Sequence, residues 1–174
     1  AVLNAESNGM RVERVYLDRS GKPATEVHAG DLLTVKLTVW SERDASWVAI
    51  ADRMPAGFEP VNTKLTATVP AADGDDANNG DDECYDCGQD WWVTYAELRD
   101  DQAWWFVDRL GSGANELTYQ VRATTAGVFT APAATIERMY EPGINGHSSE
   151  QTVKILGAGG PGTQTAITTP TKPL

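Results

Sequence analysis

The chain has 174 residues, of which 41% are hydrophobic, and it carries a net charge of −11 at pH 7. This length and composition predict one folded domain with a buried core and exclude a disordered chain. The excess of acids argues against nucleic acid, whose phosphates bind clustered Lys and Arg, and against adhesion to an anionic membrane surface. No apolar run is long enough to cross a membrane.

Short β-strands are predicted along the chain as far as residue 156. The clearest alternation lies in residues 32–41, where Leu33, Val35, Leu37 and Val39 take every second position, as on a strand with one buried face. Further strands are predicted at residues 12–18, 47–52, 91–98, 103–108, 116–124, 127–130, 133–139 and 152–156. No 3.6-residue apolar period persists for three turns. The pattern predicts an all-β, antiparallel sandwich of the immunoglobulin-like kind, with at most one short helix.

A single domain is expected over residues 1–156, with two segments that stand outside the strand pattern. An acidic insertion at about residues 70–90 holds eight of the 25 Asp and Glu residues. Residues 157–174 are rich in Gly, Thr and Pro and are predicted to form a flexible tail. Because the chain begins at Ala1 and shows no signal peptide, we expect a processed protein or an excised fragment.

The two cysteines, Cys84 and Cys87, lie in the acidic insertion with two residues between them. A redox site is disfavoured because the neighbouring Asp and Glu raise the pKa of a thiol. A zinc site would need a second pair of ligands, and the only histidines are His28 and His147. We therefore predict a local disulfide that staples the loop in an oxidising compartment.

The insertion also invites a calcium hypothesis. Counted from Asp75, a calcium-loop frame finds Asn79 at the fifth place, Gly80 at the sixth and Asp86 at the twelfth. Ala77 occupies the third place, where a ligand oxygen is required. A solvated acidic loop is the better interpretation, and neither a metal nor another cofactor is expected.

Tryptophans occur as the adjacent pairs Trp91-Trp92 and Trp104-Trp105 within predicted strands. Because adjacent strand residues face opposite sides, one member of each pair is predicted to lie in the core and the other on the outer face of a sheet. An outer tryptophan could bind a sugar, cover a partner domain or pack under a loop. The sequence leaves these alternatives open.

Motifs for catalysis are missing from the sequence. It contains no recognisable Ser, His and Asp arrangement and no zinc-protease helix motif. The acid pair Asp100-Asp101 falls between two aromatic strands, where a hairpin turn is expected. The chain is therefore predicted not to be an enzyme.

The most informative stretch is residues 116–146. After two strand-like runs, the bulky pair Met139 and Tyr140 opens what is predicted to be a loop, punctuated by Pro142, Gly143 and Gly146. Apolar residues that open a loop suggest a surface against which something packs. From the residues alone, the pair could equally be the edge of the core.

This stretch, together with residues 54–60 (MPAGFEP) and 95–101 (YAELRDD), resembles the C-terminal macroglobulin-like domain (MG10-type) of bacterial alpha-2-macroglobulins. The resemblance covers about residues 9–156. It implies a macroglobulin-like β-sandwich, a periplasmic location and a parent protein that traps proteases and is often a lipoprotein of the inner membrane.

That family's own chemistry is a thioester between a Cys and a Gln in a Cys-x-Glu-Gln motif. Here Glu150-Gln151 follows Ser149, with no Cys before it. The resemblance therefore implies the neighbouring, non-catalytic domain, in which Met139 and Tyr140 pack over the thioester and shield it from water. Its partners would be the thioester domain of the same parent chain and, indirectly, the target proteases.

Tyr140 is then expected to be at least partly exposed in this domain by itself. The alternative function is a free-standing immunoglobulin-like adhesion or carbohydrate-binding module that uses its outer tryptophans.

Overall fold

The computed structural model describes residues 4–24, 26–61, 66–68 and 92–157. These residues form strands and connecting turns, without a helix. The strands are β1 (Glu6–Asn8), β2 (Met10–Leu17), β3 (Val27–His28), β4 (Leu32–Ser41), β5 (Ala45–Arg53), β6 (Phe58–Pro60), β7 (Thr66–Thr68), β8 (Tyr95–Leu98), β9 (Gln102–Leu110), β10 (Gly113–Ala123), β11 (Gly127–Ala131), β12 (Thr135–Arg138), β13 (Glu141–His147) and β14 (Gln151–Leu156). The predicted all-β fold class is confirmed.

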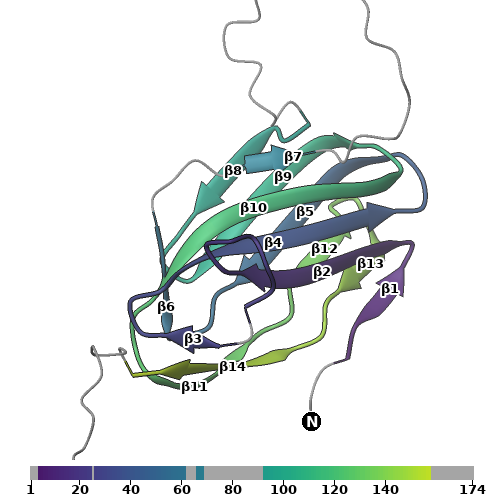
Figure 1. The fold of residues 1–174 in the computed structure, drawn as a ribbon. Helices are drawn as coiled ribbons and strands as arrows, with labels where there is room; N and C mark the ends of the chain where they lie inside the picture. Colours follow the sequence, from purple (N-terminus) through teal and green to yellow (C-terminus); the bar gives the residue numbers. More distant parts are fainter. Residues whose placement is uncertain (1–3, 25, 62–65, 69–91, 158–174) are drawn as a thin grey trace, which may run out of the picture.

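Two antiparallel sheets form the sandwich. One has the strand order β1-β13-β12-β5-β9-β8, and the other has the order β2-β4-β10-β6, with β7 also paired to β10. In Figure 1, β10, β4 and β2 lie across the front of the molecule. A third, small sheet has the order β11-β14-β3 and includes a parallel pairing between β14 and β3.

The core lies between the two large sheets, because strand alternation turns one face of each sheet inward. Along β4, Leu33, Val35, Leu37 and Val39 are buried and the residues between them are less buried, as predicted. Trp105 on β9 is 1% exposed, whereas Trp104 is only partly buried. The prediction that one member of this tryptophan pair is core is therefore confirmed.

A charged network that the sequence did not reveal lies inside the sandwich. Arg14 Nη1 on β2 donates to Asp52 Oδ1 on β5 at 2.6 Å, and both side chains are fully buried. The Tyr119 hydroxyl on β10 donates to Asp52 Oδ2 at 2.8 Å. Burial raises the pKa of the Asp52 carboxyl, and the Arg14 guanidinium opposes that rise. This network joins the two large sheets.

The prediction that a loop follows Tyr140 is wrong. Residues 141–147 instead form β13, which pairs with β12 on one side and β1 on the other. Pro142 and Gly143 fall where the register between β12 and β13 shifts, so they need not take part in a regular ladder.

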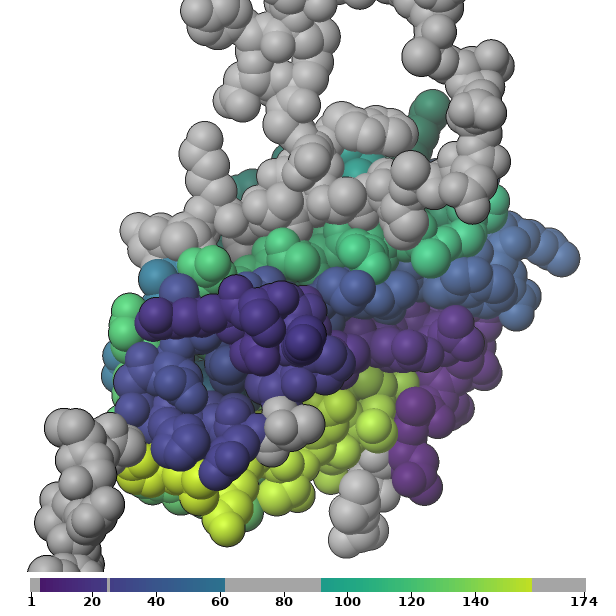
Figure 2. Space-filling view, viewed as in Figure 1, coloured from purple at the N-terminus to yellow at the C-terminus, as the bar shows by residue number. Residues whose placement is uncertain are grey.

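Gly146 marks a crossing of two chain segments and not a turn. A Cβ at this position would clash with the carbonyl oxygen of Met10. Gly9, at a φ of 82°, redirects the chain from β1 in one sheet to β2 in the other, so the backbone passes directly over β13. In Figure 2 the N-terminal strands (purple) accordingly lie against the C-terminal strands (yellow-green).

The prediction of a hairpin turn at Asp100-Asp101 is confirmed, since β8 and β9 pair antiparallel and Arg99 N–H donates to the Gln102 carbonyl at 2.8 Å. The acidic segment with Cys84 and Cys87, the calcium-loop frame from Asp75 and the tail from residue 158 onward lie outside the described residues. Within the described ranges, no group of three His, Cys, Asp or Glu side chains could hold a metal. The same ranges contain no helix that could span a membrane.

Candidate functional site at the β12–β13 turn

Three large, exposed, partly or wholly apolar side chains gather at the turn between β12 and β13. Trp47 is 50% exposed, Met139 47% and Tyr140 76%. We call them the turn cluster. The Trp47 and Tyr140 rings meet edge to face, with centroids 6.2 Å apart and planes at 86°. Tyr and Trp are enriched at protein interfaces, which makes this cluster a candidate contact surface.

The hairpin itself places Met139 and Tyr140 at its tip. Arg138 on β12 pairs with Glu141 on β13, so the two residues between them form the turn. The Arg138 guanidinium also contacts the Glu141 carboxylate at 2.6 Å, across the base of the turn. Both side chains of the turn therefore project beyond the sheet.

Trp47 has an unusual backbone at the start of β5. Its φ is 57°, in the left-handed region, and it is the only residue other than glycine with a positive φ in the described ranges. A bulky side chain in this region costs about 1–2 kcal/mol. Its carbonyl accepts the Met139 N–H at 2.8 Å, which joins β5 to the hairpin tip.

The strained backbone also disturbs the alternation of β5. Ser46 and Trp47 are both exposed, and the next three residues, Val48 to Ile50, are all buried. Sequence reasoning placed Trp47 at the start of a strand but did not predict its positive φ or its contact with Tyr140. An aromatic residue before a buried run carries no local signal for a positive φ.

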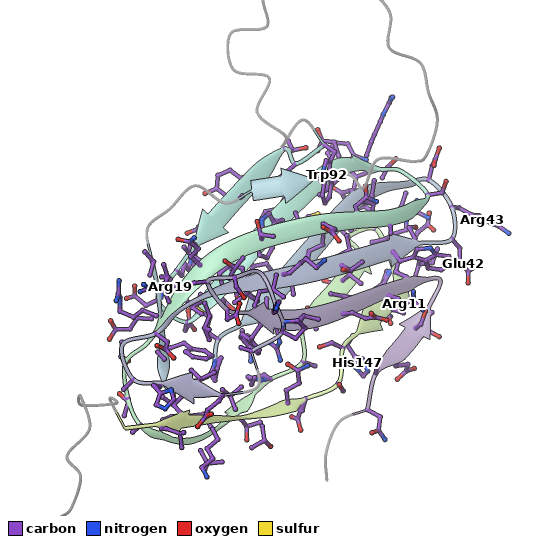
Figure 3. All side chains as sticks on the ribbon, viewed as in Figure 1. Arg11, Arg19, Glu42, Arg43, Trp92 and His147 are labelled. Carbon is purple, nitrogen blue, oxygen red and sulfur yellow. The ribbon has the colours of Figure 1, made fainter. Side chains whose placement is uncertain are left out.

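A hollow of about 380 Å³ lies beside the hairpin and is lined by Arg138 and Glu141 together with Glu42, Arg43 and Asp44. Figure 3 shows Glu42 and Arg43 at the end of the sandwich where β4 turns into β5. The charges that line the hollow are of both signs, and Arg138 and Glu141 neutralise each other. The charged lining consists of three acids and two arginines, and the turn cluster itself does not line the hollow.

The outer tryptophan on β9 is arranged differently. The rings of Trp104 and Phe106 are stacked, with centroids 5.9 Å apart and planes at 3°, and Tyr95 packs against Phe106 at 6.0 Å. Sugar recognition uses a free ring face, and the stacking occupies the face of Trp104 that is turned toward Phe106. The carbohydrate-binding alternative stays a hypothesis.

Comparison with known proteins identifies the family. A model of the bacterial alpha-2-macroglobulin MG10 domain matches residues 9–143, a range that includes Trp47, Met139 and Tyr140. The chain belongs to this family. The resemblance stated from the sequence is therefore confirmed.

Curated relatives of this MG10 domain are much longer proteins. The alpha-2-macroglobulin of Pasteurella multocida (strain Pm70) is 31% identical over 157 residues, which make up 89% of this chain and 7% of the relative. The alpha-2-macroglobulin homolog of Yersinia pestis is 29% identical over 152 residues, 81% of this chain and 7% of the relative. The chain thus spans less than a tenth of the length of these relatives.

Solved structures share the fold. Salmonella alpha-2-macroglobulin reacted with methylamine matches with a TM-score of 0.70 and 23% identity, over 90% of this chain and 10% of that one. A fragment of native Escherichia coli alpha-2-macroglobulin, from domain MG7 to the C-terminus, matches with a TM-score of 0.67 and 23% identity, over 87% of this chain and 24% of that one. The architecture is therefore that of a macroglobulin-like domain.

Of the two site residues expected from the sequence, Tyr140 is exposed as predicted, and Met139 lies beside it in the same turn. The structure adds Trp47 from β5, a residue far away in the sequence. Contact of Met139 and Tyr140 with a partner stays a prediction.

Proposed function

We propose that this MG10 domain is a non-catalytic part of a periplasmic, alpha-2-macroglobulin-type protease inhibitor. In this proposal, Met139 and Tyr140 pack against the thioester of a neighbouring domain in the same parent chain and keep water away from it. The single observation that carries the proposal is the turn cluster, in which Tyr140 is 76% exposed at the tip of the β12–β13 hairpin.

The physical argument rests on water exclusion. An activated ester survives only where hydrolysis is prevented, so a shield must present apolar surface in a fixed position. The thioether of Met139 and the ring of Tyr140 supply apolar surface, and the Arg138–Glu141 contact and the hydrogen bond to the Trp47 carbonyl hold the turn. Family membership supplies a reason to expect such a partner.

The reactive group itself must lie elsewhere, because Ser148 occupies the Cys position before Glu150-Gln151 and no Cys-x-Glu-Gln motif is present. The Salmonella relative was solved after reaction with methylamine, so that protein reacts with a small amine. Methylamine is therefore a suitable probe of shielding in the parent of this domain.

Replacing Tyr140 with alanine tests the proposal. In the full-length protein, we expect thioester loss in the presence of methylamine to accelerate about tenfold, equivalent to ~1.4 kcal/mol in the barrier. In the 174-residue chain, the free energy of unfolding should change by less than about 0.5 kcal/mol, because an exposed side chain loses little buried area. Free-thiol titration and urea unfolding provide the two measurements.

The matched control is Val128→Ala, which removes another exposed apolar side chain, 66% exposed on β11, outside the turn cluster. It should leave thioester loss unchanged. Thioester loss at the wild-type rate in a folded Tyr140→Ala protein would contradict the shielding role. Unfolding of the chain by the same change would mean that Tyr140 belongs to the core.

A further inference from the structure

We infer that Trp47 is a positioning residue, which holds Tyr140 in the orientation needed for the contact proposed above. The inference rests on that proposed function and adds a residue to it. Trp47 would act through Tyr140 and the turn, and it would not itself cover the thioester.

The backbone of Trp47 provides the first support. A positive φ is unfavourable for a tryptophan, and such conformations persist where the surrounding structure requires them, often at functional positions. At Trp47 the unusual φ accompanies a carbonyl that accepts the Met139 N–H at 2.8 Å. The main chain of β5 therefore holds the first residue of the turn.

The ring of Trp47 provides the second support. It meets the Tyr140 ring edge to face at 6.2 Å, and in the described part of the chain Tyr140 has no other aromatic contact at such a distance. A tyrosine that is 76% exposed has little else to restrict its side-chain rotamer. The Trp47 ring therefore selects the direction in which Tyr140 points.

The core does not explain Trp47. Half of its surface is exposed, and the buried residues of β5 begin again at Val48. A residue that served only to pack the core would face inward with an ordinary strand backbone. A strained residue with an exposed ring beside an exposed tyrosine fits a positioning role better.

Three substitutions of Trp47 separate the ring from the backbone. Trp47→Ala removes the ring, and Trp47→Phe retains an aromatic ring. Trp47→Gly removes the ring but adopts a positive φ without strain, so it guards against a folding defect. In the full-length protein with methylamine, we expect thioester loss to be about threefold faster for Trp47→Ala and Trp47→Gly, and close to wild type for Trp47→Phe.

The double variant Trp47→Ala/Tyr140→Ala tests whether Trp47 acts through Tyr140. Its thioester should be lost no faster than in Tyr140→Ala alone, because positioning has no effect once the positioned ring is gone. If the rate increase in the double variant were the product of the increases in the two single variants, Trp47 would shield the thioester by itself, and the inference would be overturned.

A second measurement does not depend on the thioester. In the 174-residue chain, the NMR signals of the Tyr140 ring protons should shift in Trp47→Gly, because they lose the ring current of Trp47. Unchanged signals would overturn the inference.

The outcomes also separate the two proposals. Thioester loss at the wild-type rate in Trp47→Ala and Trp47→Gly, with rapid loss in Tyr140→Ala, would refute positioning and leave shielding intact. Thioester loss at the wild-type rate in Tyr140→Ala would refute shielding.

Discussion

Replacing Asp52 with alanine is expected to lower the free energy of unfolding of the 174-residue chain by about 3–5 kcal/mol. The Asp52 carboxylate is fully buried between the sheets and accepts hydrogen bonds from Arg14 Nη1 at 2.6 Å and from the Tyr119 hydroxyl at 2.8 Å. Its removal leaves the Arg14 guanidinium charged and buried, and its remaining hydrogen-bond partners among the described residues are neutral, such as the Ala131 carbonyl at 3.2 Å. Urea unfolding followed by circular dichroism measures the loss.

Asp108→Ala is the matched control, since Asp108 is an exposed aspartate on β9. Its replacement should change the stability by less than about 0.5 kcal/mol. Tyr119→Phe should lower the free energy of unfolding by about 1 kcal/mol, between the other two variants, because one hydrogen bond is lost and no charge is left unpaired. If Asp52→Ala changed the free energy of unfolding as little as Asp108→Ala, the charged network would not join the sheets as described.

Gly146→Ala is expected to destabilise the chain by about 3 kcal/mol, the upper end of the usual range for overpacking. The added Cβ would clash with the carbonyl oxygen of Met10 and lie 2.8 Å from its carbonyl carbon. Both atoms belong to the backbone of β2, so a side-chain rotation cannot relieve the clash. Either β2 or β13 would have to move, and the core between the sheets would be disturbed.

Gly143→Ala provides a control on the same strand, because a Cβ at Gly143 meets no atom within 4 Å. This variant should match the wild-type chain within about 0.5 kcal/mol in urea unfolding. Equal stability of the two alanine variants would contradict the close crossing of β2 over β13.

The sequence by itself determined the fold class and most of the strands. Period-two alternation is a local property, so residues such as Val35 and Leu37 on β4 indicated both a strand and its buried face. The turn at Asp100-Asp101 was predictable for the same reason, since it lies between two readable strands. The exposure of Tyr140 followed from the family resemblance, because the residues alone also allowed an edge of the core.

Only the tertiary structure decided the features that join distant segments. A glycine such as Gly146 is a turn signal in a sequence, yet Gly146 lies within a strand. A glycine is needed there because the backbone of Met10, 136 residues earlier in the chain, crosses the strand at this position. Arg14 and Asp52 are buried because β2 and β5 meet across the core, and nothing in their neighbouring residues indicates that pairing. Trp47 joins the site for the same reason. Its backbone and ring are determined by a hairpin some ninety residues later in the chain, and a local pattern carries no information about contacts at that separation.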